Sequence, residues 1–387
     1  MGSLAVNADG NLAVKAGITS HGVSSRLVAV DALRGFDMFW IIGIEGSRGV
    51  VRAIRQISDS PAVEFIARQM SHAKWEGFTF CDLIFPLFIF VTGISIPLSL
   101  TRILGQSGMR AVYFRIIRRF MLLYALGVFY YGGLSRPWPG IRLLGVLQRI
   151  AICYLFASLI FCHFRLKGIL AICATILIGY WAMMTFVPVP DVGAGCFEPG
   201  RNLANYIDAQ YLPGIKVSGT WDPEGLLSTL PAIGTCLLGV CAGILLRSQS
   251  LSDSKKIAIL AIAGVAGVVL GYLWGLQFPV IKKLWTSSFV LVAGGYSCLL
   301  LAVFYLVIEV WNYRMWAQPF IWIGMNALAL YLAYQIVDFQ KLASRLVGGN
   351  IKAWAGNYGD LLVCVTAVGL CLWLARFLYS KRVFIKA

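Results

Sequence analysis

Charged residues are scarce in this sequence. Only 13% of its 387 residues are Asp, Glu, Lys or Arg, whereas 59% are hydrophobic and the mean hydropathy is +0.78. An average soluble domain has about 25% charged residues, most of them on its surface. The shortage of charge therefore excludes an ordinary soluble protein and favours a chain that lies largely within a membrane.

The period-2 alternation of apolar and polar residues is also lacking. Instead, continuous apolar runs, long enough to cross a hydrocarbon core of about 30 Å, recur along the chain. These runs exclude a transmembrane barrel, because its strands alternate. We predict an all-α, polytopic membrane protein with about ten transmembrane helices in one bundle. The predicted spans are residues 28–48, 78–101, 119–134, 144–162, 169–188, 226–247, 257–276, 285–309, 319–338 and 359–379.

Several chemical features are missing as well. The sequence has no Cys-x-x-Cys pair, no cluster of metal ligands, no Asn-x-Ser/Thr glycosylation sequon and no convincing internal repeat. Nine of the ten cysteines fall within predicted spans, so we interpret them as packing residues and not as a disulfide framework. We therefore expect no metal cofactor. The missing repeat counts against an inverted-repeat transporter.

Positive charge is in excess, with a formal net charge of +16. Basic residues concentrate after the second, fourth, sixth and tenth predicted spans, which the positive-inside rule places in the cytoplasm. We predict cytoplasmic termini: residues 1–25 form a disordered tail without the apolar core of a signal peptide, and residues 26–387 form one transmembrane domain. The basic cytoplasmic face then meets anionic lipid, and the charge requires no nucleic acid.

Ionisable and polar side chains inside the predicted spans are costly and usually face a cavity. The candidates for cavity-lining residues are Asp31, Arg34, Gln148, Arg149 and Asn326. Structural alternatives exist for most of them. Asp31 and Arg34 are spaced to pair with one another, while Gln148 and Arg149 could tie helices together.

Acidic residues near the predicted outer boundary form a second group: Glu45, Glu76, Asp82, Asp222 and Glu224. They lie in or beside two predicted outside loops, residues 49–77 and 189–224, which are long enough to build a site. Here too there are structural alternatives, because Thr79 and Asp82 fit a capping box, and Asp222 fits the N-cap of the sixth span. Glu45 is harder to explain structurally.

Histidine is nearly absent, with three copies in the chain. His72 stands at the predicted outer mouth of the second span, with Trp75 and Glu76 one helical turn away. An imidazole there can act as a general base near neutral pH or as a nucleophile. The alternative is an interfacial histidine without a chemical role, and spacing alone does not choose between the two.

The segment HAKWEGFTFCDLIFPLFIFVTG, His72 to Gly93, resembles a motif of the heparan-α-glucosaminide N-acetyltransferase family, including its bacterial DUF5009-type relatives. Further segments resemble the family in the same order, and together they cover nearly the whole chain, residues 26–385. They are VDALRGFDMFW (Val30–Trp40), GVLQRIAICYL (Gly145–Leu155), WDPEGLLSTL (Trp221–Leu230), LWTSSFVL (Leu284–Leu291) and GMNALALY (Gly324–Tyr331).

The resemblance implies transmembrane acetyl transfer. Acetyl-CoA on the cytosolic side would be the co-substrate, and a terminal glucosamine-like amine on the outer or lumenal side would be the acceptor. The family's functional histidine corresponds to His72, which either accepts the acetyl group or deprotonates the acceptor. Supporting or acceptor-binding candidates are Glu45, Trp75, Glu76, Asp82, Asp222 and Glu224, and Trp221 could stack on a sugar. Animal members carry an asparagine where this chain has Glu45, so we expect a different acceptor site.

Three alternatives are left open. An amino-sugar transporter or permease, for N-acetylglucosamine-related substrates, would use the same cavity without acyl transfer. A membrane acyltransferase-3-type enzyme would carry its key histidine in the first span, where this chain has Glu45 and no histidine. A structural membrane protein would have no need of buried ionisable residues.

The surroundings of the protein follow from the same features. The absent sequons favour a multi-pass protein of a bacterial inner membrane over one of a lysosomal or other endomembrane. The expected partners are the lipid bilayer, acetyl-CoA and an amino-sugar or oligosaccharide acceptor. The sequence leaves both a monomer and a homodimer open.

Overall fold

The computed structural model describes residues 27–42, 49–58, 60–135 and 137–384. The predicted tail, residues 1–25, and Glu45 lie outside the described residues. Within those ranges the chain forms no β-strand, and two isolated backbone bridges join Arg142 to Gly214 and Val189 to Gly193. The predicted all-α fold class is confirmed.

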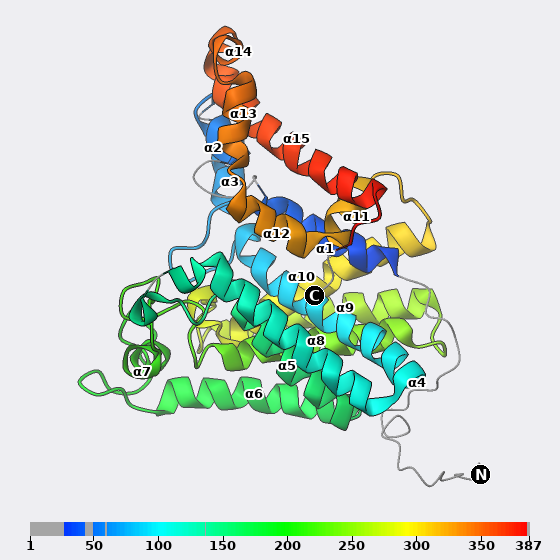
Figure 1. Ribbon diagram of the computed structural model, residues 1–387. Helices are drawn as coiled ribbons and strands as arrows, with labels where there is room; N and C mark the ends of the chain where they lie inside the picture. The colour runs from blue at the N-terminus through cyan, green and yellow to red at the C-terminus, as the bar shows by residue number, and fades with distance from the viewer. Residues whose placement is uncertain (1–26, 43–48, 59, 136, 385–387) are drawn as a thin grey trace.

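In the part of the chain that the structure describes, ten helices form the bundle, and most of the other helical elements lie in the segments that connect them (Figure 1). The bundle helices are α1 (Val28–Ile41), α4 (Phe80–Tyr130), α5 (Val146–His163), α6 (Leu166–Phe186), α8 (Thr229–Arg247), α9 (Asp253–Gly275), α10 (Ser287–Tyr305), α11 (Gln318–Met325), α12 (Ala327–Ile336) and α15 (Gly359–Ser380). The short elements are α2 (Val50–Arg55), α3 (Pro61–Gln69), η2 (Gly133–Ser135), η3 (Trp138–Gly140), α7 (Leu203–Tyr211), η4 (Lys282–Leu284), η5 (Leu306–Val310), α13 (Phe339–Val347), α14 (Asn350–Trp354) and η6 (Gly356–Tyr358).

Each of the ten predicted spans coincides with helix in the described chain. Seven single helices are long and apolar enough to cross a membrane, and α11 with α12, bent by 77°, makes an eighth. The other two predicted spans are α1, described over 14 residues, and the second half of α4. α4 contains two predicted spans because its backbone breaks at Gly108, where φ is 74°, a conformation that glycine adopts readily. The predicted count of about ten is thus approximate.

Lipid-facing surfaces show why these helices require a membrane. α9 exposes apolar side chains along its length, and Ile262 is 70% and Leu273 58% exposed. In water such a surface would be a large unprotected apolar patch, whereas in a bilayer it meets hydrocarbon. The protein is a multi-pass membrane protein.

Helix-to-helix contact inside the bundle depends on small residues. α4 packs against α8, where a Cβ atom on Gly93 would lie 2.1 Å from the carbonyl oxygen of Cys236. From the other side, a Cβ atom on Gly239 would lie 2.0 Å from the carbonyl oxygen of Phe90. Glycine at these crossings lets the two backbones touch, which is the usual basis of close packing between membrane helices.

Contacts between loops establish which helix ends share a face. At one end, which we call the site face, the indole of Trp75 donates to the carbonyl oxygen of Phe197 at 2.9 Å, and the amide of Gly77 donates to Val280 at 2.9 Å. At the opposite face, the Tyr113 hydroxyl lies 3.1 Å from Nε2 of His163. Successive predicted spans must end at alternating faces, and these contacts group the helix ends in that way. In Figure 1, α7 lies at the site face, and α2, α3, α13 and α14 project from the bundle at the top.

Candidate active site

His72 is placed by the turn between α3 and α4. The carboxylate of Asp82, in the first turn of α4, accepts hydrogen bonds through Oδ2 from the amides of Ala73 (3.1 Å) and Thr79 (3.2 Å) and from the Thr79 hydroxyl (3.0 Å). The Asp82 half of the predicted capping box is therefore present, because an acidic side chain reaches back to the N-cap amide. These hydrogen bonds tie the turn that carries His72 to the first turn of α4.

The other carboxylate oxygen of Asp82 faces His72. Nδ1 of His72 lies 2.9 Å from Oδ1 of Asp82, and Nε2 lies 3.8 Å from the thiol of Cys81. Lys282, from η4, brings its Nζ to 3.0 Å from the same Nδ1 and to 3.4 Å from Oδ1 of Asp82. The Asp82 side chain is 1% exposed, whereas that of His72 is 48% exposed, so a buried carboxylate holds an accessible ring.

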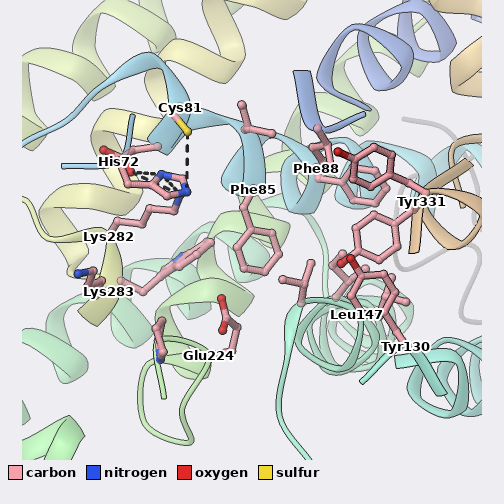
Figure 2. Close-up of a pocket in the computed structure, with 18 of the residues that line it drawn as sticks. His72, Cys81, Phe85, Phe88, Tyr130, Leu147, Glu224, Lys282, Lys283 and Tyr331 are labelled. Carbon is pink, nitrogen blue, oxygen red and sulfur yellow. Dashed lines mark hydrogen bonds and ion pairs between the residues drawn. The ribbon is translucent and has the colours of Figure 1, made fainter. Parts of the chain in front are cut away.

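A cavity of about 600 Å³ opens beside this cluster (Figure 2). His72, Lys282 and Lys283 lie together at one end, and Phe85 separates them from an aromatic end. The aromatic end is formed by Phe88, Tyr130 and Tyr331, of which the two tyrosine rings stack with centroids 4.7 Å apart. The lining also includes Cys81, Asp82 and Glu224. The cavity thus has a polar, titratable end and an apolar end.

Glu224 reaches the cavity from the segment that precedes α8. Arg142 binds Asp222 through two contacts, of 3.1 and 2.7 Å, and Glu224 through one of 2.7 Å. Burial acts to raise the pKa of Asp222. The hydrogen bonds that Asp222 makes with Arg142 and Glu224, together with the positive charge of Arg142, have the larger combined effect and hold its pKa below the ordinary value. Burial raises the pKa of Glu224. Glu224 therefore binds a proton more readily than Asp222 does.

The start of α8 corrects one structural alternative. α8 begins at Thr229, so Asp222 is not its N-cap. Instead, Asp222 accepts from the amides of Val217 (3.1 Å) and Glu224 (3.0 Å) and fixes a turn ahead of the helix. The prediction failed because Asp and Pro favour a turn as strongly as they favour a helix start.

Asp208 of α7 binds the backbone of that turn. Its carboxylate accepts from the amides of Leu226 (2.8 Å) and Asp222 (3.3 Å). Burial raises the pKa of Asp208 to about 6, against the lowering effect of these two hydrogen bonds. A Cβ atom on Gly225 would lie 1.9 Å from the Asp208 carboxylate, so only glycine fits at the end of the Asp-Pro-Glu-Gly sequence.

Trp75 and Glu76 lie near His72 without lining the cavity. Trp75 packs edge to face on Trp221, with centroids 5.7 Å apart, and the ammonium of Lys283 lies 5.8 Å from its ring centroid. The two tryptophans join the loops of the site face. Glu76 is exposed to solvent. A sugar-stacking role for Trp75 or Trp221 stays a prediction.

The intramembrane candidates are also placed away from the cavity lining. Asp31 and Arg34 pair at 3.2 Å, and Arg34 also donates to Ser95 at 2.7 Å. Their end of α1 lies at the opposite face, where the amide of Ala29 donates to Glu309. Asn326 occupies the break between α11 and α12.

Arg149 ties α5 to the segment ahead of α8, whereas the hydrogen bond of Gln148 stays within the approach to α5. Arg149 is fully buried, donates to the Ser228 hydroxyl and the Gly225 carbonyl oxygen, and places its guanidinium 5.0 Å from the Trp285 ring centroid. Gln148 donates to the carbonyl oxygen of Arg142 at 3.4 Å. The contacts of Arg149 link α5 to the segment that carries Glu224.

Sequence reasoning missed Lys282, Lys283 and the aromatic end of the cavity. A signal was available for the lysines, because two adjacent cations in a short outside loop depart from the positive-inside rule. Cys81 was interpreted only as a packing residue, although its thiol lies next to His72. Tyr331 ends the segment GMNALALY that resembles the family, whereas no signal in the sequence distinguishes Tyr130 from other interfacial tyrosines.

Comparison with known proteins identifies relatives of this chain. Residues 26–189 match the family described as Domain of unknown function (DUF5009). The human heparan-alpha-glucosaminide N-acetyltransferase (Homo sapiens) is 29% identical over 380 residues, which is 81% of this chain and 55% of that protein. The mouse protein of that name (Mus musculus) is 28% identical over 434 residues, which is 95% of this chain and 61% of that protein.

The chain is a homologue of these acetyltransferases. The predicted resemblance to the heparan-α-glucosaminide N-acetyltransferase family is thereby confirmed. The chain spans between half and two thirds of the length of the two named relatives. The substrate and the direction of transfer in this protein are therefore matters for proposal.

Proposed function

We propose that this protein is an acetyl-CoA-dependent N-acetyltransferase that acetylates the amine of a glucosamine-like sugar at the site face. One observation carries the proposal: His72 rests on the buried carboxylate of Asp82 at the entrance of a cavity with one polar and one apolar end. The homology to named acetyltransferases supplies the reaction class.

The His72–Asp82 pair supports proton transfer or nucleophilic attack. When Nδ1 carries a proton and donates it to Asp82, Nε2 keeps its lone pair. In direct transfer, Nε2 accepts a proton from the acceptor amine as the nitrogen attacks the thioester carbonyl carbon. The C–N bond forms, the C–S bond breaks, and the CoA thiolate leaves. In the two-step route, Nε2 itself attacks the thioester carbon, the C–S bond breaks and acetyl-imidazolium forms with loss of the thiolate. The amine nitrogen then attacks the acetyl carbon, the C–Nε2 bond breaks, and the amine proton passes to Nε2 and from there to the thiolate.

The apolar end of the cavity suits the pantetheine arm of the donor, and the polar end suits the acceptor. Glu224 lines the cavity and could bind the ammonium or a hydroxyl of an amino sugar. In a bacterial inner membrane the acceptor would be a cell-envelope or imported amino sugar. The site face would then be the outer side.

Acetyl-CoA is proposed to arrive from the cytosol, because its phosphates cannot cross hydrocarbon. Cations suited to those phosphates gather toward the opposite face: Arg102, Arg110, Arg115, Arg118 and Arg119. The cavity lining reaches Phe88 on α4 and Ile150 on α5, within the site-face parts of both helices. Delivery from the cytosol therefore requires a path that continues beyond these residues toward the opposite face.

Proteoliposomes test the proposal. Labelled acetyl-CoA is supplied on the face that carries Tyr113 and His163, and acetylated glucosamine is measured on the other side. We expect product with the natural protein and at least about a 100-fold loss in His72→Ala, because a general base or nucleophile is removed. His163→Gln is the matched control, since this histidine lies at the opposite face.

The rival outcome is equally clear. If the protein moves unmodified N-acetylglucosamine across the membrane and His72→Ala changes nothing, the protein is a transporter and the acetyltransferase proposal is wrong.

A further inference from the structure

Lys282 is held rigidly beside His72. It opens η4, whose last residue, Leu284, accepts a hydrogen bond from Tyr180 at 2.6 Å through its carbonyl oxygen. Trp285 then turns the chain with a left-handed backbone, φ 53°, and is 1% exposed. The Lys282 side chain is itself only 18% exposed. The buried residues that follow Lys282 therefore fix its position beside the imidazole.

The contacts of Asp82 determine what Lys282 can do. Oδ2 of Asp82 already accepts three hydrogen bonds, from Ala73 and twice from Thr79. Oδ1 is left to His72 and Lys282. A carboxylate facing a histidine alone would stabilise the imidazolium, which has no lone pair for catalysis. Here the lysine ammonium lies within 3.4 Å of the carboxylate and 3.0 Å of the ring, and it opposes that effect.

We propose that Lys282 is a positioning residue that keeps His72 in its neutral, reactive form at neutral pH. This inference rests on the proposed function of His72. The ammonium of Lys282 and the carboxylate of Asp82 form a pair with no net charge, so that His72 remains oriented through Nδ1 without gaining a second proton. In the reactive tautomer Nδ1 donates to Asp82, and the ammonium binds Asp82 and lies beside the ring without a hydrogen bond to Nδ1. Repulsion between the ammonium and an imidazolium 3.0 Å away would oppose protonation.

Other titratable groups near the ring do not substitute for Lys282. Lys283 donates to the carbonyl oxygen of Lys74 at 2.9 Å and lies over Trp75. Glu224 lines the same cavity but is paired with Arg142 at 2.7 Å. The Cys81 thiol lies on the Nε2 side at 3.8 Å. Asp82 and Lys282 both reach Nδ1 of His72, at 2.9 and 3.0 Å.

A purely structural role for Lys282 makes a different prediction. If Lys282 served only to neutralise Asp82 and hold η4, its loss would lower stability and activity at every pH. If it governs the charge of His72, its loss shifts the pH at which His72 titrates. The direction is fixed, because removing a cation beside a base makes the base easier to protonate.

The test measures the titration of His72 without relying on activity. The rate at which diethyl pyrocarbonate modifies neutral His72 is followed by mass spectrometry of the His72 peptide from about pH 5 to 9. In Lys282→Met and Lys282→Gln we expect the midpoint to rise by about one pH unit, the order expected for an ionic neighbour at this distance. Lys282→Arg should keep the natural midpoint, and Lys283→Met should shift it much less.

Acetyl transfer by the same variants should follow the modification data. The Lys282→Met variant should lose about tenfold in kcat/KM below its midpoint and recover most of it at alkaline pH. An unchanged or lowered midpoint in both neutral variants would overturn the inference. If the natural protein acetylates nothing, the proposed function fails, yet the modification midpoints still decide the role of Lys282.

Discussion

At the scale of the residue, one carboxylate serves both the fold and the site. Asp82 binds the turn through Oδ2 and faces His72 through Oδ1. The capping alternative and the functional hypothesis drawn from the sequence are therefore compatible. A side chain that satisfies a helix end can also orient an imidazole, because a carboxylate has acceptor sites for about four hydrogen bonds.

Asp82→Asn is expected to lower kcat/KM by about 100-fold or more. The amide can donate to Nδ1 and stabilise the wrong tautomer of His72, which places the proton on Nε2. Steady-state acetyl transfer in proteoliposomes measures the effect. Glu64→Gln is the matched control, because this carboxylate is exposed on α3 and pairs with Arg55 at the surface. Equal activity in Asp82→Asn and the natural protein would contradict the assigned role.

Asp208 gives the fold a pH dependence of known sign. Its pKa of about 6 in the folded protein is above the ordinary 3.8, so the folded state prefers the protonated carboxyl. Its contribution is therefore favourable below about pH 4 and is lost as the pH rises to about 6. Thermal unfolding in detergent should show the natural protein losing stability relative to Asp208→Asn across this window. Parallel pH curves for the two proteins would show that Asp208 titrates normally.

At the scale of the element, the site is assembled from segments that are far apart in the sequence. The turn after α3, the segment ahead of α8 and η4 each supply one wall of the cavity. Arg142, ahead of α5, binds one of these segments, the one ahead of α8, through Asp222 and Glu224. Its guanidinium also lies 4.4 Å from the ring centroid of Tyr131, which follows the last residue of α4. We call the contacts of Arg142 with Asp222, Glu224 and Tyr131 the clamp.

Arg142→Met is expected to destabilise the protein by about 3 kcal/mol or more, because two carboxylates lose a buried partner. The Arg142 side chain is 10% exposed and that of Asp222 is fully buried. Arg201→Met is the matched control: its 2.8 Å pair with Glu198 is 60% and 64% exposed and should contribute less than about 1 kcal/mol. The midpoint of thermal unfolding compares the two. Similar losses in both variants would contradict the clamp.

At the scale of the whole molecule, the reaction proposed here depends on two chemically distinct faces. The site face carries His72 and the acidic segment around Glu224, whereas the opposite face carries the Tyr113–His163 contact and the arginines after the second span. An enzyme built in this way can separate a phosphate-bearing donor from a sugar acceptor. The assignment of the site face to the outer side stays a prediction.

Thiol labelling tests the orientation. Ser218→Cys lies in an exposed loop of the site face, and Ser254→Cys is exposed at the opposite face. In intact cells a membrane-impermeant maleimide should label Cys at position 218 and should label position 254 only after the membrane is permeabilised. The parent protein controls for its own cysteines, most of which are buried in the described chain. The reverse pattern would place the site face in the cytoplasm.

Much of the fold could be predicted from apolar runs, because the membrane requires continuous apolar helices. The number of spans was harder to fix, since a kink at Gly108 and a break at Asn326 alter helices without altering composition. Of the site, His72, Asp82 and Glu224 were predicted as candidates, and they do share a cavity. Asp31, Arg34, Gln148, Arg149 and Asn326 were predicted to line a cavity, but they do not belong to the lining around His72.

The sequence by itself determined the class of the protein, most of its helices and its resemblance to a known family, because hydrophobicity and motifs are local properties of the chain. Only the tertiary structure decided which polar residues meet. Lys282 approaches His72 across 210 positions, and Arg142 approaches Glu224 across 82. Such contacts depend on how helices cross and loops fold back over their ends, and neither is encoded in the spacing of any single segment.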